Sequence, residues 1–251
     1  MANQHTPDLS SFGSKINAAV IGASGGIGNA FCDLLESSPQ VVNLVRCSRS
    51  ESAVSAGHLH TDLEKEESLL AAAAAIKESL GELHLVIIAS GILHEENLIQ
   101  PEKTWRGLDT GALETLFRIN ASGPALAAKH FLPLLARERK TAFSALSARV
   151  GSIEDNELGG WYAYRASKAA LNMLIKTLSI ELARKNKEAL CIGLHPGSVD
   201  TPLSKPFQNA VPDAQLLSPK TSARRLLAVL NRLAPSDTGG LFAWDGQRIP
   251  F

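Results

Sequence analysis

A glycine-rich turn near the start of the chain limits most strongly the folds that it can adopt. Residues 15–21 form a short apolar run of strand length, and residues 29–35 have the pattern of a helix. Between them lie Gly22, Gly26 and Gly28. A strand, a glycine turn and a helix in this order can present backbone N–H groups and a positive helix end to a pyrophosphate. The spacing is GxxxGxG rather than the commoner GxGxxG, and such a turn can also be only a tight connection.

The alternation of strand and helix continues along the whole chain. Apolar runs of strand length cover residues 41–49, 58–63, 83–89, 141–146, 190–195 and 240–244, and helical patterns cover residues 65–80, 113–135, 161–183 and 221–233. About seven strands and a similar number of helices predict an α/β fold, a doubly wound (Rossmann) parallel sheet flanked by helices. We expect one catalytic NAD(P)-binding domain over residues 15–251, preceded by a flexible N-terminal extension over residues 1–14.

The composition excludes several classes of function. The 251 residues include 25 basic and 25 acidic side chains, so no net charge attracts nucleic acid or an anionic membrane. Three widely spaced cysteines form no CxxC or Cys/His cluster, and His58 and His60 have no third ligand nearby, so we expect reduced thiols and no metal. Without a signal-peptide pattern or about 18 uninterrupted apolar residues, we expect a cytoplasmic protein that does not span a membrane.

The end of the second strand bears on the choice of cofactor. In a dinucleotide-binding fold this strand end lies beside the adenosine ribose, where a carboxylate suits NAD and an arginine suits the 2′-phosphate of NADP. Arg46 and Arg49 lie here, and no acidic residue occurs before Glu51. Charge therefore favours NADP(H), with NAD(H) as the second choice, although both arginines can also simply be solvated.

A tyrosine and a lysine share one helical face later in the chain. Tyr164 and Lys168 stand four residues apart in a helical pattern, so the ammonium group is expected one turn from the phenol. A nearby cation favours the phenolate and would lower the pKa of the tyrosine towards the range of a general acid or base. An exposed amphipathic helix can carry the same pair by chance.

These features belong together if the sheet is parallel, because ligands bind beyond the carboxyl ends of its strands. The polar or glycine residues that follow the strands are Gly22, Arg49, Ser90, Asn120, Ser147 and Thr201. The combination of GxxxGxG, Asn120, a serine before YxxxK, and Pro-Gly followed by Thr201 resembles the short-chain dehydrogenase/reductase family from about Ile16 to Phe251. Residues 146–153, 159–168 and 244–251 further resemble its C-factor and sniffer-type carbonyl reductase branch.

The resemblance implies roles for individual residues. Tyr164 would be the proton donor, Lys168 would lower its pKa and hold the nicotinamide ribose, and Asn120 would fix a water in the proton relay. The pyrophosphate turn would be Gly22, Ser24, Gly26, Ile27 and Gly28, and the adenine would contact Asp62 and Leu63. Ser90 and Gly91 would contact the cofactor at the end of the fourth strand. After the turn at Pro196 and Gly197, Val199 and Thr201 would hold the carboxamide and so fix which nicotinamide face meets the substrate. Asn120 can instead cap a helix, Asp62 can stabilise a turn, and Thr201 can be an ordinary loop residue.

The chain also departs from the family pattern. Ile21 replaces the usual threonine before the first glycine, and residues 88–91 read IASG where NNAG is usual. The usual pair of serines falls on Ser147 and Ala148, and the second of the pair is the usual catalytic one. We expect Ser147 to take that role; Ser152 from the following loop, or no hydroxyl at all, are the alternatives.

Together these features predict reversible hydride transfer between NADP(H) and a carbonyl or secondary alcohol of a small organic substrate. Tyr164 would give the proton and Ser147 a second hydrogen bond. The alternative is a non-catalytic dinucleotide-binding protein, with a signalling or scaffold role, that resembles C-factor. Loops 147–160 and 202–219 would line the substrate pocket, and Trp161, Leu203 and Phe207 suggest an apolar or aromatic carbonyl compound, although these side chains can equally be packing. The helices at 125–135 and 171–182 would form a homodimer or homotetramer.

Overall fold

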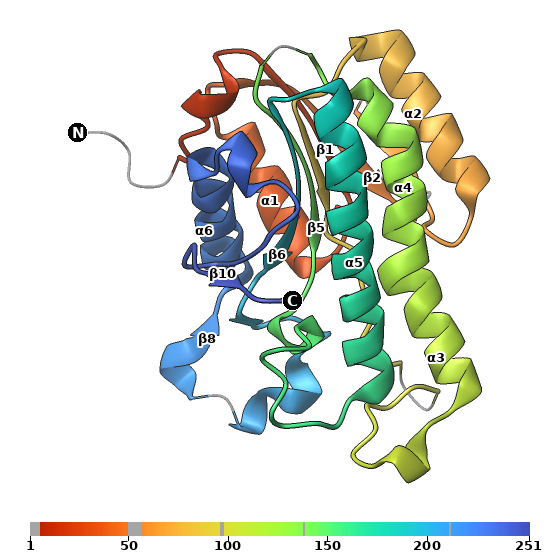
Figure 1. Cartoon of the computed structure of the whole chain (residues 1–251). Coiled ribbons are helices and arrows are strands. Elements are labelled where there is room, and N and C mark those ends of the chain that lie inside the picture. The colour runs from red at the N-terminus through yellow and green to blue at the C-terminus, as the bar shows by residue number, and fades with distance from the viewer. Residues whose placement is uncertain (1–5, 50–56, 96–97, 138, 211) are drawn as a thin grey trace.

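The structure is a computed structural model that describes residues 6–49, 57–95, 98–137, 139–210 and 212–251. A central sheet separates two layers of helices (Figure 1). The eight strands run in the order β10-β9-β6-β5-β4-β1-β2-β3, and every neighbouring pair is parallel except β9 and β10. Their bounds are Ile16–Ile21 (β1), Val41–Ser48 (β2), His58–His60 (β3), Leu85–Ile88 (β4), Thr141–Leu146 (β5), Ala189–His195 (β6), Leu241–Ala243 (β9) and Arg248–Ile249 (β10).

The doubly wound parallel sheet predicted from the sequence is confirmed. The eighth strand, β10, was not expected; it has only two residues and lies antiparallel at the edge of the sheet. A separate pair consists of β7 (Ser198–Val199) and β8 (Leu216–Leu217). The strand order reverses between β1 and β4, which is the position where open α/β sheets bind their ligands.

Helices cover both faces of the sheet. One face is packed by α1 (Gly26–Glu36) and α6 (Pro219–Arg232), the other by α2 (Glu66–Leu80), α4 (Gly123–Phe131) and α5 (Tyr162–Lys185). The shorter α3 (Thr110–Phe117) packs on α5. The 3₁₀ turns are Ser10–Phe12, Trp105–Gly107, Leu132–Leu134, Arg149–Gly151, Lys205–Ala210, Asp213–Gln215 and Pro235–Asp237. Across the described ranges, no helix combines the length and the apolar character that crossing a bilayer requires.

The pattern at residues 113–135 is interrupted rather than continuous. A π-helical turn (Arg118–Ser122) joins α3 to α4 and contains Asn120. Such turns are rare and shift the register of the side chains that follow them. Asn120 therefore points to the interior, where it is fully buried, instead of following the face set by α3.

The N-terminal segment was expected to be flexible, and from residue 8 onward it is packed. Leu9 and Phe12 are buried in the same core cluster as α1 and α6. The Asp8 carboxylate accepts the backbone N–H of Ser10 at 2.9 Å and the side-chain amide of Asn231 at 3.2 Å. The buried side chains of Leu9 and Phe12 thus attach residues 8–12 to the domain. Residues 1–5 lie outside the described part.

Candidate active site

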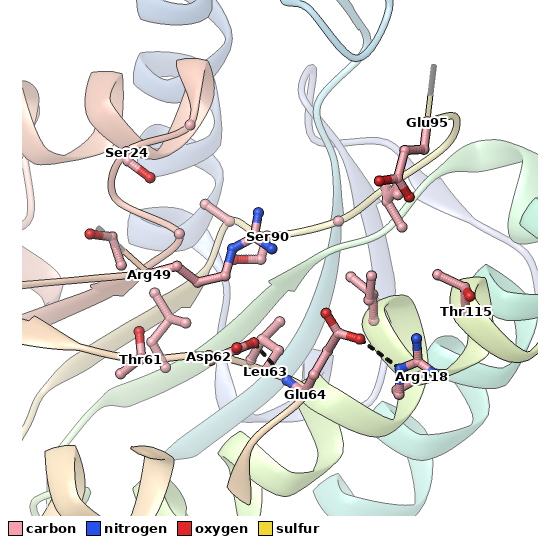
Figure 2. Close-up of a pocket in the computed structure, with 18 residues that line it drawn as sticks. Ser24, Arg49, Thr61, Asp62, Leu63, Glu64, Ser90, Glu95, Thr115 and Arg118 are labelled. Atoms are coloured by element: carbon pink, nitrogen blue, oxygen red, sulfur yellow. Dashed lines mark hydrogen bonds and ion pairs between the residues drawn. The ribbon is translucent and has the colours of Figure 1, made fainter. Parts of the chain in front are cut away.

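A groove of about 580 Å³ lies at the carboxyl ends of β1, β2, β3 and β4 (Figure 2). Its size is within the usual range for cofactor and ligand sites. Strand ends, the loop after β4, α3 and the π-helical turn supply its lining: Ile21, Gly22, Ser24, Gly25, Ser48, Arg49, Thr61, Asp62, Leu63, Glu64, Ala89, Ser90, Gly91, Ile92, Glu95, Thr115, Arg118 and Ile119. Seven residues predicted to bind the cofactor line this groove: Gly22, Ser24, Arg49, Asp62, Leu63, Ser90 and Gly91.

The glycine turn forms one wall of the groove because its backbone segments approach closely. Gly22 has a φ of 87°, a left-handed conformation that favours glycine. A Cβ atom at Gly28 would collide with the carbonyl oxygen of Gly22, so α1 can begin this near to β1 only with glycine there. Ser24 is exposed at the groove, and Ile27 packs against the core below it. The turn thus brings the N-terminus of α1 to the groove, as predicted.

The two arginines at the end of β2 have different environments. Nη2 of Arg46 lies 2.8 Å from Glu36 Oε1 and 3.6 Å from Asp33 Oδ1, so α1 supplies its counter-charges. Arg49 is exposed, and its side chain extends into the groove (Figure 2). Within the described ranges it forms no ion pair. Of the two, only Arg49 therefore offers its positive charge to a ligand in the groove.

Residues after β3 line the adjoining part of the groove. Oγ1 of Thr61 is buried and has no hydrogen-bond partner among the described residues. The Asp62 carboxylate accepts the backbone N–H of Glu64 at 3.1 Å, so it stabilises a turn as well as lining the groove. Leu63 is buried against Gly123 at the start of α4. An unpartnered buried hydroxyl beside this groove fits a site that binds a polar ligand.

A salt bridge at the edge of the groove, beside Leu63, was not predicted from the sequence. Glu64 Oε1 accepts from Arg118 Nε at 2.6 Å, and Figure 2 shows the pair beside Leu63 and Thr115. The two residues are 54 positions apart and belong to no motif of the chain. Only the packing of α3 and the π-helical turn next to β3 brings them together, so no local pattern could have revealed them.

Tyr164 and Lys168 occupy one face of the first turns of α5, as the spacing predicts. Both side chains are buried, and Lys168 Nζ lies 5.8 Å from the centre of the Tyr164 ring while donating to Leu146 O at 2.9 Å. Burial raises the pKa of the Tyr164 phenol and lowers the pKa of Lys168 to about 8. Burial thus sets the direction of the Tyr164 pKa in this structure, opposite to the direction that we expected from Lys168.

Asn120 lies close to the same pair. Its Nδ2 donates to Ile92 O at 2.8 Å and to Ser167 Oγ at 3.1 Å, and its Oδ1 accepts from Ile92 N at 2.9 Å. A Cβ atom at Gly91 would lie 3.2 Å from Asn120 Oδ1 and 3.3 Å from Lys168 Nζ. Gly91, Asn120 and Lys168 therefore converge at the end of the groove nearest to α5, and Asn120 does not serve as a helix cap.

The Ser147 side chain is buried and forms a hydrogen bond with Asn172. Its hydroxyl donates to Asn172 Oδ1 at 2.7 Å, and Asn172 Nδ2 donates in turn to Gly151 O at 3.2 Å. Because a hydroxyl has a single proton, Ser147 does not donate a second hydrogen bond in this arrangement, and the substrate contact expected of it requires its bond to Asn172 to break. Ser152 accepts from the backbone of Asp155 at 3.0 Å. Ala148, by contrast, packs in the hydrophobic cluster that contains Tyr164.

The segment after β6 approaches the glycine turn from the other side. Val199 is buried, and its carbonyl oxygen accepts from Thr201 Oγ1 at 3.4 Å. A Cβ atom at Gly26 would lie 3.0 Å from the Thr201 methyl group, so Thr201 sits directly over the start of α1. Pro196 and Gly197 form the turn that leads to it, with a φ of 80° at Gly197. None of these five residues is part of the groove lining given above.

Three rings form what we call the aromatic wall: His94, Trp161 and Phe207. The ring centres of Trp161 and Phe207 are 5.1 Å apart, and those of His94 and Phe207 are 5.5 Å apart. The Trp161 ring also lies 6.3 Å from the Tyr164 ring, edge to face. Trp161 and Phe207 were expected near the substrate; His94 was not, and Leu203 is not among the residues packed on this cluster.

The glycine turn at a helix N-terminus, the groove at the reversal of strand order and the unpartnered Thr61 hydroxyl together fit a bound dinucleotide. They define a dinucleotide-binding protein of the Rossmann class. Residues 17–211 match the model of the family described as "short chain dehydrogenase". The chain belongs to this family, whose members are NAD(P)-dependent oxidoreductases.

Two curated relatives are similar over much of the chain. The chain is 30% identical to 1-hydroxy-2-glutathionyl-2-methyl-3-butene dehydrogenase of Rhodococcus sp. over 74% of this chain and 76% of that protein. It is 35% identical to C-signal of Myxococcus xanthus over 57% of this chain and 81% of that protein.

Solved structures have the same fold. The NADPH-bound carbonyl reductase from chicken fatty liver matches with a TM-score of 0.79 and 26% identity, over 94% of this chain and all (100%) of that one. The carbonyl reductase Sniffer of D. melanogaster matches with a TM-score of 0.81 and 23% identity over the same shares. The expected resemblance is confirmed in sequence by C-signal and in fold by Sniffer.

Proposed function

We propose that the protein is an NADP(H)-dependent carbonyl reductase that interconverts a carbonyl compound and the corresponding alcohol. The observation that carries this proposal is the convergence of Tyr164, Lys168, Asn120 and Gly91 at the end of the groove. A buried phenol beside a buried amine, next to a dinucleotide-sized groove, suits proton transfer coupled to hydride transfer. The similarity to a carbonyl reductase with bound NADPH supports the same reaction.

The cofactor, when bound, supplies the hydride from C4 of its nicotinamide. In the direction of reduction, the phenol of Tyr164 donates a hydrogen bond to the substrate carbonyl oxygen and transfers its proton as negative charge develops there. Burial keeps this phenol protonated until the reaction occurs, because burial raises its pKa. The charge on the oxygen exists mainly in the transition state, so this donor raises kcat more than it lowers KM.

Lys168 and Asn120 hold the phenol and resupply its proton. Lys168 donates a hydrogen bond to Leu146 O, and its pKa of about 8 lets it exchange protons near neutral pH. Asn120 is fixed on both sides by the backbone of Ile92, which keeps its amide beside Lys168 Nζ. Through Asn172, Ser147 anchors the loop at Gly151 to α5, and we assign it this positioning role in place of substrate contact.

Arg49 is the residue that we propose to select NADP(H) over NAD(H). Its side chain extends into the groove (Figure 2), without an acidic partner in the described parts of the chain. An arginine can bind a phosphate group bidentately, and it gains nothing comparable from a ribose hydroxyl. Gly22, Ser24, Gly26, Ile27 and Gly28 would hold the pyrophosphate, and Asp62 with Leu63 the adenine.

The experiment that tests the proposal is NADPH consumption by the purified protein with a panel of aldehydes, ketones, quinones and diketones. NADH is run in parallel, and a Tyr164→Phe variant serves as the control. Turnover that requires Tyr164 and prefers NADPH supports the reductase. Tight binding of NADPH without turnover of any carbonyl compound would favour the alternative, a signalling role like that implied by the name of the related C-signal.

We also propose that two or four copies assemble through α4 and α5. Met173 and Ile180 are large apolar side chains exposed on α5. An apolar helix face exposed to water is costly and is usually covered by a partner. Light scattering of the purified protein, compared with a Met173→Glu/Ile180→Glu variant, tests this assembly; a wild-type monomer would contradict it.

A further inference from the structure

The connection into α5 is unusual because three successive residues have a left-handed backbone. The φ angles are 63° at Gly159, 66° at Gly160 and 52° at Trp161. Among the described residues, Trp161 is the single non-glycine residue with positive φ. This conformation is unfavourable for a bulky side chain, and it persists only where the surroundings hold it.

Glu102 holds this connection from a distant part of the chain. It is only 7% exposed, and both of its carboxyl oxygens accept the backbone N–H of Ala163, each at 3.3 Å. Its backbone carbonyl accepts from Trp161 N at 2.6 Å. The residue at the helix N-cap, Trp161, has no side-chain acceptor to offer. Glu102, 61 positions before Ala163, therefore supplies the cap that the local sequence lacks.

Arg165 fastens the same connection from within α5. Its Nε donates to Gly159 O at 3.2 Å and to Gly160 O at 2.9 Å, and its Nη1 donates to Val150 O at 3.2 Å. Glu102 and Arg165 thus bind opposite ends of a left-handed segment three residues long. The tyrosine proposed as proton donor lies directly between Ala163 and Arg165, so both contacts also fix the first turn of α5.

The left-handed backbone of Trp161 sets where its ring lies. The ring packs edge to face on Phe207, with ring planes at 61°, and edge to face on Tyr164, with ring planes at 74°. His94 completes the aromatic wall: its ring meets Phe207 at 73°, and its Nε2 lies 3.4 Å from Pro202 O. Leu93, Ala148 and Ala163 pack in the same cluster as Tyr164. On the side away from Lys168, the neighbours of the Tyr164 ring are therefore apolar and in part aromatic.

We propose that Glu102 is a positioning residue that holds Trp161 in place, and that the aromatic wall so formed selects planar aromatic carbonyl compounds over aliphatic ones of similar size. The substrate class rests on the carbonyl reductase activity proposed above. A flat ring can stack on these rings or meet their edges, while a puckered ring of the same carbon count gains less from them.

The test compares benzaldehyde with cyclohexanecarbaldehyde, which have six-membered rings and the same reacting group. The ratio of their kcat/KM values is measured for the wild type and for each variant, so that intrinsic reactivity cancels. Trp161→Gly keeps the left-handed backbone but removes the ring, and it lowers the ratio about three- to tenfold. Glu102→Ala lowers the ratio similarly, whereas Glu102→Gln, which keeps an acceptor for Ala163, retains most of it. Glu78→Ala, on the exposed face of α2, leaves it unchanged. Equal ratios in all variants would overturn the proposed selection.

A thermal double-mutant cycle decides the role of Glu102 independently of turnover. Glu102→Ala lowers the Tm of the wild type by about 4 °C, and it lowers the Tm of Trp161→Gly by less, because glycine adopts the left-handed backbone unaided. Equal losses in both backgrounds would refute the positioning role. If the wild type reduced neither aldehyde nor any other carbonyl compound, the proposed function and the substrate class would both fail, while the cycle would still decide whether Glu102 holds Trp161.

Discussion

The two ends of the site are built in different ways. The cofactor end consists of backbone turns and short polar side chains at successive strand ends, including Gly22, Ser24 and Ser90. The proposed substrate end consists of large rings brought together from separate loops, with the backbone around Trp161 bound by Glu102 from another part of the chain. The first end depends on local sequence and can be shared by many enzymes, whereas the second depends on long-range contacts and is the end that we propose to select the substrate.

Replacement of Tyr164 by phenylalanine should affect turnover at one end of the site and leave NADPH binding at the other end intact. The variant loses the proton donor but keeps the ring, so we expect kcat to fall by about 10³-fold or more while NADPH affinity stays within about twofold. Steady-state kinetics and calorimetric titration of NADPH measure the two quantities. Equal turnover in both proteins would show that the phenol takes no part in the reaction.

Replacement of Lys168 by methionine tests the cost of the buried amine. Burial lowers the pKa of Lys168 from its ordinary 10.5 to about 8, which corresponds to about 3 kcal/mol of destabilisation at neutral pH. Loss of its hydrogen bond to Leu146 O offsets about 1 kcal/mol. We therefore expect Lys168→Met to raise the free energy of unfolding of the ligand-free protein by about 2 kcal/mol while abolishing turnover.

The pH dependence of that difference has a definite sign. Between pH 8 and pH 10.5 the unfolded chain keeps the Lys168 proton and the folded chain does not, so wild-type stability gains from this group as pH rises. The advantage of Lys168→Met is therefore largest below pH 8 and disappears towards pH 10.5. Urea unfolding over this range measures it, with Lys176→Met, an exposed lysine of the same helix, as the control. A constant difference would contradict the depressed pKa.

Replacement of Arg49 tests how the cofactor end of the site distinguishes NADPH from NADH. We expect Arg49→Ser to raise the KM for NADPH about 10- to 100-fold and to leave the KM for NADH nearly unchanged, because a charge-assisted contact with the 2′-phosphate is lost. Arg46→Ser is the matched control, since Arg46 is already paired with Glu36 and Asp33. Equal changes for the two cofactors would assign Arg49 to structure rather than to phosphate binding.

Substitutions at Ser147 and Ala148 have the smallest expected effects on kcat. Ser147→Ala removes an anchor of Asn172, so we expect a lower Tm and a loss in kcat of less than about tenfold. Ala148→Ser places a hydroxyl in the cluster that contains Tyr164, and we expect it to raise kcat by about threefold or more through a second donor. A loss of more than a hundredfold in Ser147→Ala would restore Ser147 as a group that contacts the substrate.

The sequence was informative where structure follows from neighbouring residues. The strand at 141–146 and the long helix that carries Tyr164 were predicted nearly to their bounds, because apolar periodicity and glycine signals are local. The shared position of Gly22, Arg49 and Ser90 along the groove followed from the rule that parallel strands end at one edge.

The remainder depended on contacts between distant segments. The π-helical turn at Asn120 and the left-handed Trp161 break the regular period, and tertiary packing alone stabilises them. Glu102 lies in a loop without a motif, and its partner is 61 positions away. The hydrogen bond from Ser147 to Asn172 was not foreseen for the same reason: alignment by position indicates a residue but not the partner of its hydroxyl.

The most direct test of the central claim is transfer of deuterium from NADPH labelled at C4 of the nicotinamide. The two stereoisomers of the label are used separately with an aldehyde that the protein reduces, and the alcohol is analysed by mass spectrometry. Because Val199 and Thr201 are proposed to fix the carboxamide, and thus the face that meets the substrate, we expect the label from one isomer alone at the carbinol carbon. Unlabelled alcohol from both isomers would contradict direct hydride transfer at this site.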